Sequence, residues 1–152
     1  MKKHLLIVFV FIMLGSCNSS EKKTTIVEVS ITEVNKEAQK DPELEASIDR
    51  GKEIYTDFCM SCHMPNGKGV PKAFPPLAAS DYLMNKRVES IRSIKYGQSG
   101  EIKVNGDIYN NVMAPLGLED EEIADVMNYI TNSWCNSNDK IITPEEVSEI
   151  EE

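Results

Sequence analysis

The sequence predicts a small all-α domain with one short β-hairpin. Apolar residues recur at spacings of three and four in several segments, which is the period of an amphipathic helix. A single Asn105-Gly106 pair lies between residues typical of strands and is a strong short-range signal for a hairpin. The length of 152 residues fits one domain with extensions.

The chain begins with a segment that predicts export. Lys2 and Lys3 precede an apolar run, residues 5–14. This run is too short to cross a bilayer, which needs about 20 residues, and is typical of a signal-peptide core. It ends in Leu14-Gly15-Ser16-Cys17, which resembles the lipobox of bacterial lipoproteins. The resemblance implies a signal peptide over residues 1–16, cleavage before Cys17 and lipidation of that cysteine. The alternative is an ordinary secreted protein with a chance cysteine.

Much of the acidic excess lies in two flanks: residues 18–47 carry four lysines against seven acidic residues, and residues 136–152 carry one lysine against six. Loss of Lys2 and Lys3 with the leader leaves 14 basic against 25 acidic side chains, a net charge of −11, which argues against nucleic-acid binding. Residues 17–40 are polar and contain no aromatic residue, so we expect a lipid-anchored linker there. Residues 136–152 are expected to form an acidic tail. Thr143 and Pro144 can start one helical turn, and the final glutamates are expected to be solvated or to meet a basic partner.

The first predicted helix leads into a cysteine motif. Asp41 is a suitable N-cap and Pro42 suits the first helical position. One side of this helix carries five residues at spacings of four, three, four and four: Leu44, Ile48, Gly51, Tyr55 and Cys59. The expected domain covers residues 41–135.

The motif Cys59-Met60-Ser61-Cys62-His63 is typical of a c-type haem attachment site. Two thiols at this spacing can add to the two vinyl groups of one haem, and a neutral imidazole is a good iron ligand. A zinc site needs four ligands, but Cys17, Cys135 and His4 form no second ligand pair. A thioredoxin-like dithiol belongs in a strand-rich α/β unit, and no such pattern flanks this motif.

The remaining elements follow in order. Ser80 can cap a short helix through Met84, and a second helix is expected over residues 87–96, closed by Gly97. The hairpin around Asn105-Gly106 comes next. The last helix starts near Glu119 and has an apolar stripe of four residues: Ile123, Val126, Met127 and Ile130.

Residues 48–135 resemble class I, monohaem cytochromes c. Gly51 and Tyr55 stand eight and four residues before Cys59, as the family's glycine and aromatic residue do. The segment Ala73-Phe74-Pro75-Pro76-Leu77 resembles the family's segment beside the haem histidine. The resemblance implies a covalent haem c and crossed first and last helices. It also implies a hydrogen bond from the histidine ring to a proline carbonyl, for which Pro75 is preferred and Pro76 is the alternative.

The resemblance also implies a methionine as the sixth iron ligand. We expect Met113, which lies in a loop near a proline between the hairpin and the last helix. Met84 is the main competitor. Met60 and Met64 are tied to the attachment motif, and Met127 suits the core of the last helix.

The implied function is that of a one-electron carrier, not an enzyme, tethered outside the cytoplasm on the periplasmic side or cell surface and passing electrons between redox partners. Alternatives are an electron-entry subunit of a nitrite reductase, a dehydrogenase or a terminal oxidase, and a gas-binding sensor with an open iron position. Six cations between the haem motif and the hairpin are expected to form a docking rim for an acidic partner or to be dispersed solubilising charge: Lys68, Lys72, Lys86, Arg87, Arg92 and Lys95. Trp134 is expected to pack near a haem edge or the helix pair. Cys135, where the family often has glycine, is expected to form an intermolecular disulfide or to be buried and inert.

Overall fold

The computed structural model describes residues 41–152. The predicted signal peptide of residues 1–16, the linker of residues 17–40 and the lipidation site Cys17 therefore lie outside the described residues. Within the described part, no helix is long and apolar enough to cross a membrane.

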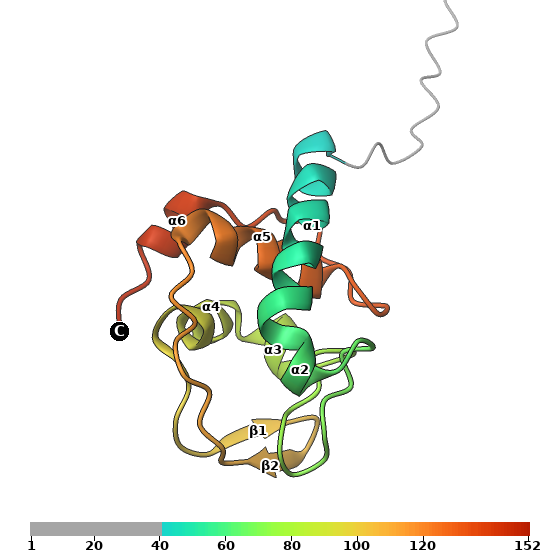
Figure 1. The fold of residues 1–152 in the computed structure, drawn as a ribbon, viewed down its shortest axis with the longest axis vertical. Coiled ribbons are helices and arrows are strands. Elements are labelled where there is room, and N and C mark those ends of the chain that lie inside the picture. Colours follow the sequence, from blue (N-terminus) through green and yellow to red (C-terminus); the bar gives the residue numbers. More distant parts are fainter. Residues whose placement is uncertain (1–40) are drawn as a thin grey trace, which may run out of the picture. The chain divides into compact units, whose positions relative to one another are not determined.

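Helices and one hairpin make up the described chain (Figure 1), which confirms the predicted fold class. In chain order the elements are α1 (Pro42–Ile54), the π-helical turn η1 (Tyr55–Cys59), α2 (Met60–His63), α3 (Asp81–Asn85), α4 (Arg87–Tyr96), β1 (Ile102–Val104), β2 (Asp107–Tyr109), α5 (Asp120–Thr131) and α6 (Pro144–Ser148).

The expected caps are present. The Asp41 carboxylate accepts a hydrogen bond from the Glu43 amide at 3.0 Å, and the Ser80 hydroxyl accepts one from the Leu83 amide at 3.2 Å. The hairpin turns through Asn105 and Gly106, whose φ angles are +51° and +89°. Two positive φ angles in sequence are the signature of a type I′ turn, which matches the twist of the paired strands.

Helices α1 and α5 cross at close range (Figure 1), and Gly51 makes the approach possible. A Cβ atom on Gly51 would lie 2.0 Å from the carbonyl oxygen of Asp125, so only hydrogen fits there. The buried Asp125 carboxylate accepts hydrogen bonds from Ser47 at 2.7 Å and from Arg50 at 2.6 Å. The crossing is therefore fixed by backbone contact and by a polar link between the two helices.

Three aromatic rings hold the end of this crossing next to the cysteine motif. Tyr55 lies 5.4 Å from Tyr129 and 5.1 Å from Trp134, measured between ring centroids. Tyr129 contacts both Gly51 and Tyr55, and Trp134 packs on the helix pair, one of its two expected positions. Trp134 also covers Gly67, where a Cβ atom would lie 2.5 Å from the indole ring.

The C-terminal segment beyond residue 135 packs against the domain, so the expectation of a separate acidic tail is wrong, whereas the final glutamates are exposed, as expected. Ile142, Val147 and Ile150 are all buried in the core, although the acidic side chains between them stay largely exposed. The segment also accepts hydrogen bonds from cations of α4, and Arg87 binds the Glu146 carboxylate with two of its nitrogens. Hydrogen bonding to Arg87 lowers the pKa of Glu146.

The same contacts change the interpretation of the six cations. Arg87, Arg92 and Lys95 all donate hydrogen bonds to the C-terminal segment, and Lys95 also pairs with Asp120 at 3.0 Å. Lys72 pairs with Asp107 at 3.3 Å. Most of the cations expected to form a docking rim therefore bind oxygen atoms of the same chain.

Cys135 is exposed, so the expectation of a buried thiol is wrong. Its φ angle is +71°, in the left-handed region that favours glycine. This backbone conformation explains why glycine suits the position.

Candidate haem-binding site

The cysteine motif sits at the end of a continuous helical run. Helix α1 widens into the π-helical turn η1, and α2 then carries Met60 to His63. Single π-helical turns within α-helices are frequent at functional sites. Met64, with a φ angle of +66°, ends the run. The Tyr55 hydroxyl donates a 2.6 Å hydrogen bond to the Met64 carbonyl, which ties the exit of the motif to the helix crossing.

The loop after the motif fixes the orientation of the His63 ring. The Nδ1 atom of His63 lies 3.0 Å from the carbonyl oxygen of Pro75, and the preferred proline is thus the one in contact. Gly69 allows the loop to close, because a Cβ atom there would lie 2.2 Å from the carbonyl oxygen of Phe74. With Nδ1–H donating to Pro75, the Nε2 atom is left as the free ligand nitrogen. Burial lowers the pKa of His63, which favours the neutral ring that metal binding needs.

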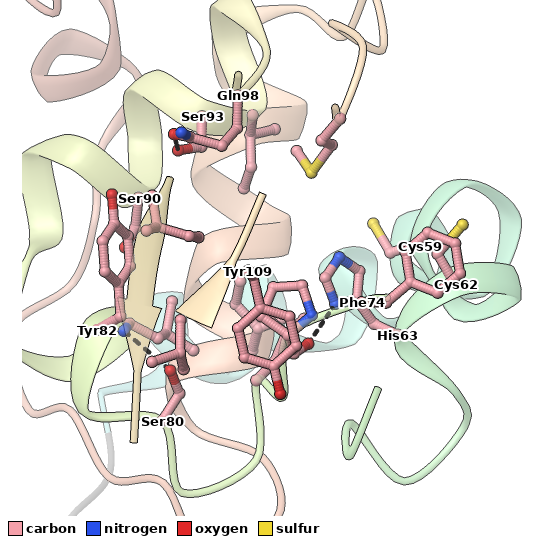
Figure 2. Close-up of a pocket in the computed structure, with 18 of the residues that line it drawn as sticks. Cys59, Cys62, His63, Phe74, Ser80, Tyr82, Ser90, Ser93, Gln98 and Tyr109 are labelled. Atoms are coloured by element: carbon pink, nitrogen blue, oxygen red, sulfur yellow. Dashed lines mark hydrogen bonds between the residues drawn. The ribbon is translucent and has the colours of Figure 1, made fainter. Parts of the chain in front are cut away.

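A cavity of about 280 Å³ opens next to His63, near the lower end of the usual range for ligand sites. Its walls are mostly apolar and come from the motif, the proline loop, α3, α4, the hairpin, the loop after it and α5. Figure 2 shows Cys59, Cys62 and His63 on one side of the cavity. Phe58 and Val112 line it as well, yet they are 46% and 75% exposed, so the cavity reaches the surface beside them.

Met113 lines the same cavity, and its backbone is pinned to the end of α4. The amides of Gln98 and Met113 donate to each other's carbonyl oxygens at 2.8 Å in both directions. Gly97 permits this pairing, since a Cβ atom there would lie 2.7 Å from the Met113 carbonyl oxygen. Met84 does not line the cavity, and it is 37% exposed. Met127 lines the cavity but lies fully buried in the core, the role expected for it.

The side chains at this cavity fit a covalent haem better than they fit a zinc site or a redox-active dithiol. Burial raises the pKa of the Cys59 thiol to about 11, with a smaller contribution from Cys62, whereas a redox dithiol needs a lowered thiol pKa. Residues 41–152 contain no cluster of three or more His, Cys, Asp or Glu side chains arranged for a metal ion. Two thiols and an imidazole beside an apolar cavity suit a porphyrin instead.

Sequence reasoning missed two parts of this site. Gln98 was not singled out, and its pairing with Met113 has no local signal because the two residues are brought together by the fold. Ser90 was also missed, since a serine within an apolar helix stripe is easily taken for a tolerated polar residue. Its hydroxyl is buried at the cavity wall and has no hydrogen-bond partner in the described structure.

Comparison with known proteins agrees with this site. The family model described as cytochrome c matches residues 48–134. Cytochrome c-552 of Thermus thermophilus is 40% identical over 109 residues, which cover 66% of this chain and 82% of the relative. The cytochrome c subunit of a quinone alcohol dehydrogenase from Gluconobacter oxydans is 27% identical over 103 residues, covering 66% of this chain and 21% of the subunit.

A third relative is the FixP subunit of a cbb3-type cytochrome c oxidase from Bradyrhizobium diazoefficiens. It is 33% identical over 101 residues, which cover 62% of this chain and 33% of the subunit. The chain belongs to the cytochrome c family and is an electron-transfer protein that carries covalently attached haem c, with Cys59 and Cys62 in place for the attachment.

Proposed function

We propose that this protein is a membrane-tethered one-electron carrier whose haem iron is held by His63 and Met113. The observation that supports it most is that one cavity is lined by both residues, each on a backbone fixed by hydrogen bonds. The haem supplies the ferric and ferrous states, so one electron enters and one leaves in each cycle.

The residues around the cavity would control this reaction through ligation and exclusion of water. Pro75 holds the imidazole of His63 in one tautomer, which makes its Nε2 atom available. The thioether of Met113 is a soft ligand that favours ferrous iron and raises the reduction potential. His63 and Met113 together would hold the haem iron and leave it no coordination position for a substrate or a gas, so the haem would supply electron transfer only.

Electrons would enter and leave where the cavity meets the surface. Phe58 and Val112 mark this place, and both are apolar. Since Arg87, Arg92 and Lys95 bind the C-terminal segment, they are not free to form a basic docking rim. Residues 41–135, with the C-terminal segment packed on them, would form the redox module.

The tether would come from Cys17, with residues 1–16 removed and residues 17–40 as a linker. Two or more acyl chains hold a protein stably on a membrane, whereas one does so only weakly. The mature protein would then stand outside the cytoplasm in the cell envelope, on the periplasmic side or at the cell surface.

The tether predicts a defined N-terminus. Intact mass measurement of the protein from membranes should give a chain that starts at Cys17 and carries diacylglycerol, usually with a third acyl chain. The Cys17→Ser variant should lack these lipid masses, while its haem spectrum stays that of the wild type. A wild-type chain that starts elsewhere and carries no lipid would contradict the tether.

A second candidate is an electron-entry subunit of a larger redox enzyme. It is favoured by the relatives that are subunits of a quinone alcohol dehydrogenase and of a cbb3-type oxidase. The two functions differ in how firmly the partner is held.

Capture from membranes separates the two functions. The protein is solubilised in mild detergent and captured through a tag placed after Glu152, which is exposed. A free carrier should arrive without a stoichiometric catalytic partner after a high-salt wash, and added ferrous protein should be oxidised by the same membranes. A dehydrogenase, reductase or oxidase retained at about one copy per haem would favour the subunit, and failure of the membranes to oxidise the protein would contradict the carrier.

A further inference from the structure

Ser90 is the one residue in the described part of the chain that buries a side-chain polar atom without a hydrogen-bond partner. The residue is 6% exposed, lies within α4 and lines the cavity. A buried hydroxyl without a partner is costly because it has given up its hydrogen bonds to water, so such groups are rare in native proteins. Its position at the cavity wall indicates that the missing partner belongs to the molecule that fills the cavity.

Haem has few polar atoms that could serve as the hydrogen-bond partner of Ser90. The periphery of the porphyrin carries two propionate carboxylates on the edge opposite the two vinyl groups. The vinyl edge is the one that bonds to Cys59 and Cys62. Figure 2 shows Ser90, together with Ser80 and Tyr82, on the opposite side of the cavity from the two cysteines. Ser90 therefore lies on the side toward which the propionates point.

No cation is available on the cavity wall to hold a propionate. None of the residues that line the cavity in the described structure is a lysine or an arginine. A carboxylate at this wall must therefore be stabilised by neutral donors or reach solvent.

Two of the neighbouring donors are already engaged, and a third is held in place. The Ser93 hydroxyl donates to the Glu89 carbonyl at 2.7 Å, and the Ser80 hydroxyl accepts from the Leu83 amide and is thereby held at the start of α3. The Asn111 amide donates to the Ala73 carbonyl at 2.9 Å. Ser90 differs from all three because its buried hydroxyl neither donates nor accepts a hydrogen bond in the described chain.

We propose that the Ser90 hydroxyl donates a hydrogen bond to a haem propionate and so holds the propionate edge of the haem against α4. The step requires no covalent chemistry, and Ser90 acts as a positioning residue for the cofactor. Cys59 and Cys62 fix one edge of the haem, and Ser90 fixes the opposite one.

The test is resonance Raman spectroscopy of the holoprotein, because the bending modes of haem propionates respond to hydrogen bonding. In Ser90→Ala one propionate mode should move to lower frequency. Denaturant unfolding of the same variant should give a folded-to-unfolded ratio about tenfold smaller than that of the wild type, the usual effect of losing one hydrogen bond to a charged group. Ser90→Thr keeps the hydroxyl and should keep the wild-type frequency.

Ser93→Ala is the matched control, since it removes a hydroxyl from the same helix and the same cavity wall that already has a partner in the chain. Its propionate modes should not move. If Ser90→Ala leaves the propionate modes unchanged and is as stable as the wild type or more stable, the hydroxyl does not bind a propionate and the proposal is wrong. A mode that moves in Ser93→Ala but not in Ser90→Ala would also overturn it.

Discussion

Replacing Gly51 with alanine should destabilise the folded holoprotein by about 3 kcal/mol or more. The new Cβ atom would lie 2.0 Å from the carbonyl oxygen of Asp125 and 2.9 Å from the Cβ atom of Tyr129. The first is backbone and the second is fixed to it, so neither can rotate away. Helices α1 and α5 would have to separate, which disturbs the links from Ser47 and Arg50 to Asp125. Denaturant unfolding followed by far-UV circular dichroism measures the loss.

The sign of this effect is informative because helix propensity alone predicts the reverse. Alanine is favoured over glycine by about 1 kcal/mol in the interior of a helix. Lys52→Ala, one residue further on the exposed side of α1, is the matched control and should change the free energy of unfolding by less than about 0.5 kcal/mol. An unchanged or increased stability of Gly51→Ala would mean that the two helices do not cross at the observed distance.

The elements with local signals could be predicted from the sequence. Asp41 and Ser80 cap helices with their own side chains, and Asn105-Gly106 supplies the two positive φ angles of a tight hairpin. The attachment motif was equally clear, since two thiols and a histidine at this spacing serve few other purposes. In each case the residue that carries the signal also makes the contact.

The parts that could not be predicted depend on distant partners. Ile142, Val147 and Ile150 are spread through a stretch of mainly polar and acidic residues, and no local pattern shows that the domain buries them. The pairing of Gln98 with Met113 joins residues fifteen positions apart across the hairpin. The lack of a hydrogen-bond partner for the Ser90 hydroxyl likewise follows from the folded cavity wall and has no signal in the sequence.

Replacing Met113 with alanine should remove the sulfur-to-iron charge-transfer band of the ferric protein. The reduction potential should fall by on the order of 0.1 V, part of the roughly 0.8 V range that axial ligation spans. The physical reason is that the thioether favours ferrous iron, and a water or an open position in its place favours it less. The ferrous variant should bind carbon monoxide readily at neutral pH, whereas the wild type should not. Absorption spectroscopy with a redox titration measures all three effects.

Two controls connect these effects to Met113 itself. Met84→Ala changes a partly exposed methionine that does not line the cavity, so its band, potential and response to carbon monoxide should match the wild type. Met127→Leu changes a buried methionine that does line it, and the conservative replacement should leave the band in place. A band that survives in Met113→Ala but disappears in either control would assign the ligand to that other methionine. Ready binding of carbon monoxide by the wild type would instead favour an open iron position and a gas-binding role, because an iron already held on both sides leaves no coordination position for the gas.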